Sequence, residues 1–116
     1  MRLLFPVSEK ALLELVGKLK NLLPESIIIT GHCLQYASVR GIDVSVALNY
    51  FLKTECEWQF SKEKGSEGKR VEAVKRLSKR RGLLGVFEVN AKTYLITVFK
   101  INTRKQKYSG LKSHER

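Results

Sequence analysis

The chain has 116 residues and carries 22 lysines and arginines against 11 aspartates and glutamates, a formal net charge of +11. Hydrophobic residues make up 43% of the sequence and charged residues 28%. These proportions predict one folded domain and exclude a disordered chain. No apolar run approaches the roughly 20 residues that span a bilayer, and no signal peptide is predicted.

The positive charge is unevenly distributed along the sequence. Residues 1–61 hold six basic and six acidic side chains, whereas residues 62–116 hold sixteen basic and five acidic ones. The whole excess of +11 therefore lies in the second half. Interspersed charges of both signs would keep a domain soluble equally well, so this segregation favours a polyanionic partner.

The first predicted elements are a strand over residues 2–7 and a helix over residues 8–23. Ser8 is a suitable N-cap for this helix, and Pro24 ends it. Apolar residues recur every three or four positions and form one stripe, at Leu12, Leu15, Val16, Leu19, Leu22 and Leu23.

A strand is predicted over residues 26–39, which begin with a β-branched run. Residues 43–53 fit two periodicities: alternation typical of a half-buried strand, and a helical face behind an Asp43 cap. We favour the strand, because an alternating pattern continues through Cys56, Trp58 and Phe60. Trp58 and Phe60 are expected in the core.

The second half is predicted to form a helix and a hairpin. The helix covers residues 67–81 and is ended by Gly82 at its C′ position. Two β-rich runs follow at residues 83–89 and 94–101, joined by turn residues, which indicates a β-hairpin.

These elements predict an α+β fold, with a mixed or antiparallel sheet covered by two helices and ending in a β-hairpin. Residues 1–101 are expected to form the single domain and residues 102–116 a flexible basic tail. The alternative takes residues 43–53 as a helix. The C-terminal half would then have the outline of a winged helix-turn-helix, with the hairpin as its wing.

The predicted helix over residues 67–81 is the first candidate binding surface. Its cations fill one arc opposite the apolar stripe, where they could meet successive phosphates of a nucleic acid, although Glu72 lies within the same arc. The basic tail is the second candidate, and Tyr108 could stack on a base. The predicted nucleic-acid-binding residues are Lys69, Lys75, Arg76, Lys79, Arg80, Arg104, Lys105 and Lys107.

The main alternative function is a small nuclease, toxin-like or DNA-processing. Glu55, Glu57 and Glu88 are the strand-borne acids that a metal-dependent enzyme would use, and His32 with Tyr36 would serve a metal-free one. A second alternative is a protein-interaction module for an acidic partner.

Metal and disulfide chemistry are not predicted. The sequence has no CxxC pair and no spaced pair of histidines, so no metal site, catalytic residue or cofactor is assigned. His32 and Cys33 are adjacent and would point to opposite faces of a strand. Cys33 and Cys56 are expected to be reduced core residues.

The sequence therefore predicts a protein that binds DNA or RNA mainly through the phosphate backbone and that is not expected to be an enzyme. It is expected to be cytoplasmic or nucleoid-associated and to have no membrane partner. The choice between DNA and RNA, and whether the chain forms a homodimer, stay open.

Overall fold

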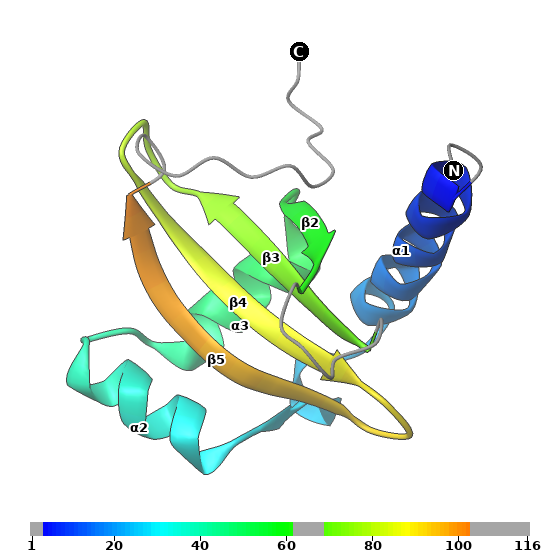
Figure 1. The fold of residues 1–116 in the computed structure, drawn as a ribbon. Coiled ribbons are helices and arrows are strands. Elements are labelled where there is room, and N and C mark those ends of the chain that lie inside the picture. Colours follow the sequence, from blue (N-terminus) through cyan, green and yellow to red (C-terminus); the bar gives the residue numbers. More distant parts are fainter. Residues whose placement is uncertain (1–3, 62–68, 103–116) are drawn as a thin grey trace.

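The computed structural model describes residues 4–61 and 69–102, which form an α+β fold (Figure 1). The elements in chain order are α1 (Leu4–Lys20), a 3₁₀ turn η1 (Pro24–Ser26), β1 (Ile28–Ile29), α2 (Gly31–Val39), α3 (Val44–Lys53), β2 (Glu57–Phe60), β3 (Arg70–Arg76), β4 (Arg81–Val89) and β5 (Thr93–Asn102).

The strands form one five-stranded sheet in the order β1-β5-β4-β3-β2. Strand β1 pairs with β5 in parallel, and the remaining neighbours are antiparallel. The predicted mixed sheet and the β4–β5 hairpin are therefore confirmed. The described residues hold three α-helices, and only the first of them, α1, corresponds to one of the two helices that the sequence predicted.

The helix α1 carries part of the predicted leucine stripe: it ends at Lys20, before Leu22 and Leu23, and Ser8 lies inside it and is not its N-cap. Leu12, Val16 and Leu19 are buried, while Lys10 and Glu14 are exposed. The predicted strand over residues 2–7 is wrong over residues 4–7, because α1 already begins at Leu4. Pro6 lies in the first turn, where the missing N–H has no intrahelical acceptor to lose.

Residues 26–39 contain only a two-residue strand, so the prediction of a strand across this segment is wrong. The Thr30 hydroxyl accepts a hydrogen bond from the backbone N–H of Cys33 and caps α2. Cys33 and Ala37, four positions apart, are the buried residues of α2 and turn toward the core. The β-branched run therefore ends where a helix N-cap begins.

Residues 44–53 are helical, so the strand that we favoured there is wrong and the alternative is right. The Asp43 carboxylate accepts a hydrogen bond of 3.2 Å from the N–H of Val46. The buried residues of α3 recur with helical spacing: Val44, Ala47, Leu48, Phe51 and Leu52. Strand β2 follows and buries Trp58, as predicted.

The predicted helix over residues 67–81 is also wrong within the described residues, because β3 and the start of β4 occupy it. Gly82 lies inside β4 and ends no helix. Val71 and Ala73 are buried on one face of β3, whereas Val74 is buried on the other. Because β3 buries residues on both faces, its apolar residues do not alternate with polar ones as in a half-buried strand. The same residues fall within one arc at helical periodicity, which is why the sequence predicted a helix. The winged alternative, which needs this second helix in the C-terminal half, fails with it.

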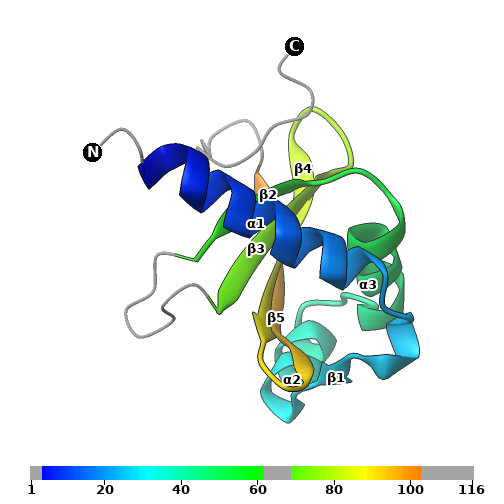
Figure 2. The same ribbon diagram turned by 90° about the vertical axis from the view of Figure 1, so that its right-hand side faces the viewer.

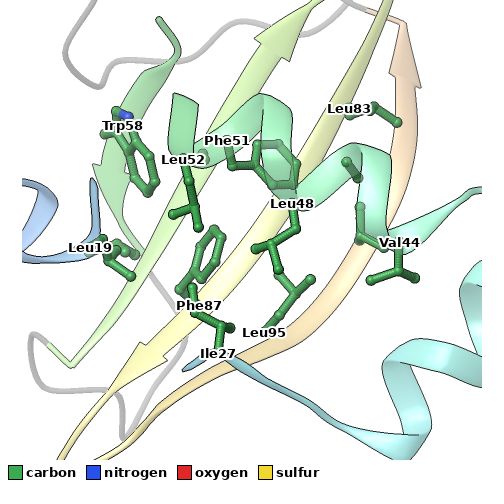
Figure 3. Close-up of a cluster of buried hydrophobic side chains, with 14 of the residues drawn as sticks. Leu19, Ile27, Val44, Leu48, Phe51, Leu52, Trp58, Leu83, Phe87 and Leu95 are labelled. Atoms are coloured by element: carbon green, nitrogen blue, oxygen red, sulfur yellow. The ribbon is translucent and has the colours of Figure 1, made fainter. Parts of the chain in front are cut away.

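The main core lies between the helices and one face of the sheet. Figure 1 shows α3 crossing behind the strands and α2 lying beside β5. Figure 2, viewed at 90° to this, shows α1 crossing close to β2. Side chains of α3 point onto the strands, where Phe51 meets Phe87 edge to face with ring centroids 5.8 Å apart (Figure 3).

Gly85 sits where α3 crosses the sheet. A Cβ at this position would overlap the Phe51 ring, with its Cζ atom only 2.8 Å away. The absence of a side chain at Gly85 therefore allows the close approach of α3 to β4.

Candidate nucleic-acid interface

The connection between β3 and β4 concentrates positive charge. Five of the seven residues from Lys75 to Arg81 are basic and none is acidic. Lys75 also pairs with Leu83, which pairs with Lys100, so these three residues lie on the same face of the sheet. We call this cluster the basic end. It comprises Lys75, Arg76, Lys79, Arg80, Arg81 and Lys100.

The turn that carries the basic end is held by its own hydrogen bonds. The N–H groups of Leu77 and Ser78 donate to the carbonyl of Arg81 at 2.8 and 3.1 Å. The Ser78 hydroxyl accepts from the N–H groups of Arg80 and Arg81 at 3.4 and 3.2 Å. This short-range network fixes the backbone from which Lys79 and Arg80 project.

Two cations of the basic end are engaged within the fold. The Nε of Arg76 lies 2.7 Å from the carboxylate of Glu57, whose side chain is only 6% exposed. The Nζ of Lys75 donates to the carbonyl of Glu55 at 3.3 Å and lies 5.8 Å from the centre of the Tyr50 ring. These contacts join the basic end to β2 and to the C-terminal part of α3.

The basic end also includes four cations at the surface. Lys79, Arg80, Arg81 and Lys100 are all exposed. Within residues 4–61 and 69–102, no acidic side chain forms an ion pair with Arg80, Arg81 or Lys100. Part of the positive charge is therefore uncompensated at the surface.

The structure brings together most of the described candidates and separates one. Lys75, Arg76, Lys79 and Arg80 gather at the basic end, on a hairpin instead of the predicted helix. Lys69 precedes β3 at its opposite end, roughly 20 Å away along the seven-residue strand. The other three predicted residues, Arg104, Lys105 and Lys107, lie outside the described residues.

Sequence reasoning did not select two members of the basic end. Arg81 directly follows Lys79 and Arg80 in one basic run, so the sequence alone was sufficient to select it. Lys100 joins the cluster only through the β3–β4–β5 ladder, and no local pattern could have identified it.

The acids of the nuclease alternative are separated. Glu57 binds Arg76, and Glu88 binds Arg70 at 2.9 Å and accepts from Asn90 at 2.8 Å. Glu55 is exposed between α3 and β2. In the part of the chain that the structure describes, no three His, Cys, Asp or Glu side chains gather as metal ligands.

The proposed histidine and tyrosine pair lies on a helix. His32 and Tyr36 are one turn apart on α2, with ring centroids 4.5 Å apart in a T-shaped contact, and the Arg40 guanidinium lies 4.8 Å above the Tyr36 ring. His32 is exposed and its neighbour Cys33 is buried, so the two do not share a site. This row is an ordinary contact along one helix face.

Both cysteines are free thiols. Burial raises the pKa of Cys33 above its usual value. Burial also raises the pKa of Cys56, and the nearby Lys20 and Lys75 offset this only in part. Both residues therefore stay protonated near neutral pH, where a thiol is a weak nucleophile and a weak metal ligand.

The sheet face opposite α3 is hollowed in two adjoining places of about 540 and 510 Å³. Arg70 and Ile96 line both hollows. Because Arg70 is bound to Glu88, this face offers less uncompensated charge than the basic end.

No protein-family model, curated protein or solved structure matches this chain. None of the described helices combines the length and the apolar composition needed to cross a membrane.

Proposed function

We propose that this protein binds nucleic acid through its phosphate backbone, with the basic end as the main contact. The observation that carries the proposal is the run from Lys75 to Arg81, with five cations and no acid, on a fixed turn at one end of the sheet. Lys100 extends it across three strands, a width of about 10 Å.

The mechanism is charge neutralisation with release of counterions. Cations that meet phosphates displace condensed counterions, so the logarithm of affinity falls linearly with the logarithm of salt concentration. The cations of the exposed turn can meet phosphates whatever the base sequence, so this contact positions the nucleic acid. The predicted tail residues Arg104, Lys105 and Lys107 follow Asn102, which pairs with Arg81.

The test compares two variants with the same net charge. One replaces Lys79, Arg80 and Arg81 by Gln, and the control replaces the exposed Lys10, Lys18 and Lys92 by Gln. Fluorescence anisotropy with labelled DNA and RNA is measured from 50 to 300 mM salt. We expect the first variant to lose at least about tenfold in affinity and about two to three units of salt slope.

The control should lose less than about threefold under the same conditions, since its lysines lie away from the basic end. Equal losses in the two variants would show that only net charge matters and would overturn the proposed interface. Displacement of the nucleic acid by polyglutamate of equal charge at 150 mM salt would favour an acidic protein partner instead and would also contradict the proposal.

A further inference from the structure

The helices α2 and α3 form a helix-turn-helix. Helix α2 ends in a Schellman motif, in which Gly41 N–H donates to the carbonyl of Ser38 at 3.2 Å and Ile42 N–H donates to that of Ala37 at 2.8 Å. Gly41 has a φ of 69°, which favours glycine. Asp43 then caps α3, so the connection has four residues.

Each of these two helices packs on the sheet through its inner face. Ala37 of α2 and Ala47 of α3 are both 1% exposed, and Ile42 in the turn packs against the same core. Figure 1 shows that the two helices run in different directions after the turn. A short turn containing glycine between two such helices is typical of the motif that places its second helix in the major groove of DNA.

The outer face of α3 is exposed and suited to base edges. Its exposed side chains are Ser45, Val46, Asn49 and Lys53, and none is acidic. An Asn amide can pair with adenine and a Val methyl group can contact the thymine methyl group. The Asn49 amide donates only to the carbonyl of Ser45 within its own helix, a bond that a base could replace.

The outer face of α3 adjoins the basic end. Tyr50 of α3 lies beneath Lys75, and Lys53 is in the last turn of the same helix. The acids closest along the chain are Asp43, whose carboxylate caps α3, and the exposed Glu55. A polyanion held by the basic end would therefore lie next to a helix face that has no negative side chain.

We infer that α3 enters the major groove of duplex DNA while the basic end binds the flanking phosphates. This inference rests on the proposed function and names its ligand class. An α-helix with its side chains is about 10–12 Å across, and the B-form major groove is about 12 Å wide, so α3 fits into it. The deep, narrow major groove of duplex RNA excludes it.

The experiment compares 24-base-pair DNA and RNA duplexes of the same sequence, and the matching single strand of DNA, at 150 mM salt. The variant Ser45→Glu with Asn49→Glu adds two negative charges to the outer face of α3. The control Lys10→Glu makes the same change in charge on exposed α1. The two added carboxylates lie four residues apart and repel each other, but one complements the N-terminus of α3 and the other can pair with Lys53. Circular dichroism verifies folding.

We expect the unmodified protein to bind duplex DNA at least about tenfold more tightly than duplex RNA. The α3 variant should lose at least about tenfold on duplex DNA, and no more than the control on the other two ligands. Equal binding of both duplexes, or equal effects of the α3 variant and the control, would overturn the role of α3 and leave the proposed function standing. Absence of binding to all three ligands would overturn both.

Discussion

Arginines and glutamates lie at both ends of the β3–β4 ladder. The two ends differ in the extent to which acidic side chains pair with the basic ones. At one end, Arg70 binds Glu88, and the amide of Gln59 on the neighbouring strand binds Glu72 at 2.9 Å. At the other end, five cations fall within seven residues and Glu57 compensates Arg76.

This difference separates structural charges from charges that are available to a ligand. Cross-strand pairs at the Arg70 end satisfy each other and contribute to holding neighbouring strands in register. At the basic end, the cations outnumber the described acid that pairs with them, and an uncompensated cluster of like charges lowers stability unless an anion joins it. The second arrangement is the one expected of a binding surface.

The largest effect is expected on the free energy of unfolding, from a substitution at the point where α3 crosses the sheet, because both ends of the ladder depend on this crossing. Gly85→Ala places a methyl group against the Phe51 ring, at the crossing that positions the ladder under α3. We expect the free energy of unfolding to fall by about 1–3 kcal/mol, measured by urea denaturation.

The matched control for this change is Gly17→Ala on α1, where no heavy atom lies within 4 Å of the added carbon. It should raise the stability by up to about 1 kcal/mol, because alanine favours the helix. Combining Gly85→Ala with Phe51→Leu should cost less than the sum of the two single changes. Strict additivity would show that the ring is not the obstacle.

A smaller effect is expected from releasing Arg76. Glu57→Gln removes the charge that compensates this arginine and leaves the shape of the side chain almost unchanged. We expect affinity for nucleic acid at 50 mM salt to rise about two- to threefold. The free energy of unfolding should fall by only about 1 kcal/mol, because solvent hydrates the part-exposed Arg76 and so limits the cost of removing its charged partner. Unchanged affinity would place Arg76 outside the interface.

The smallest effect is expected from the same substitution at the other end. Glu88→Gln releases Arg70 and adds the same positive charge, but no comparable cluster surrounds it. Affinity should change by less than about 1.5-fold and stability by about 0.5 kcal/mol, since both side chains are part-exposed. A rise equal to that of Glu57→Gln would mean that the two ends are equivalent for binding.

Local patterns predicted α1 and the β4–β5 hairpin, although the hairpin buries residues on both faces, with Leu83 in one cluster and Leu84 in the other. Leu12, Val16 and Leu19 of the predicted stripe are buried on α1, whereas Leu23 lies beyond the helix and is exposed. The two runs of the β4–β5 hairpin lie where the sequence places them. The segment from Arg70 to Arg76 was misread because Val74 is buried on the face opposite Val71 and Ala73. This burial depends on the whole sheet, which no local window contains.

The clustering of the candidate residues was predicted better than the element that carries them. Lys75, Arg76, Lys79 and Arg80 are so close in sequence that they stay together on a helix or on a hairpin. The positions of Lys69 and Lys100 could not be predicted without the sheet. Because residues 70–76 form a strand, Lys69 lies far from the cluster, and the pairing of β4 with β5 places Lys100 next to it. The helix-turn-helix was missed because residues 26–39 were assigned to a strand.

The outer edge of β5 is occupied by the segment that leads into α2. Thr30 donates its N–H to the carbonyl of Leu95 at 3.2 Å and its hydroxyl to that of Ile96 at 3.3 Å, directly after the two-residue strand β1. Open strand edges are templates for aggregation, and a covered edge removes that template. The opposite edge is the four-residue β2, too short to be an effective template. Edge-to-edge pairing is thereby limited at the start of β5, from Tyr94 to Ile96, and along β2.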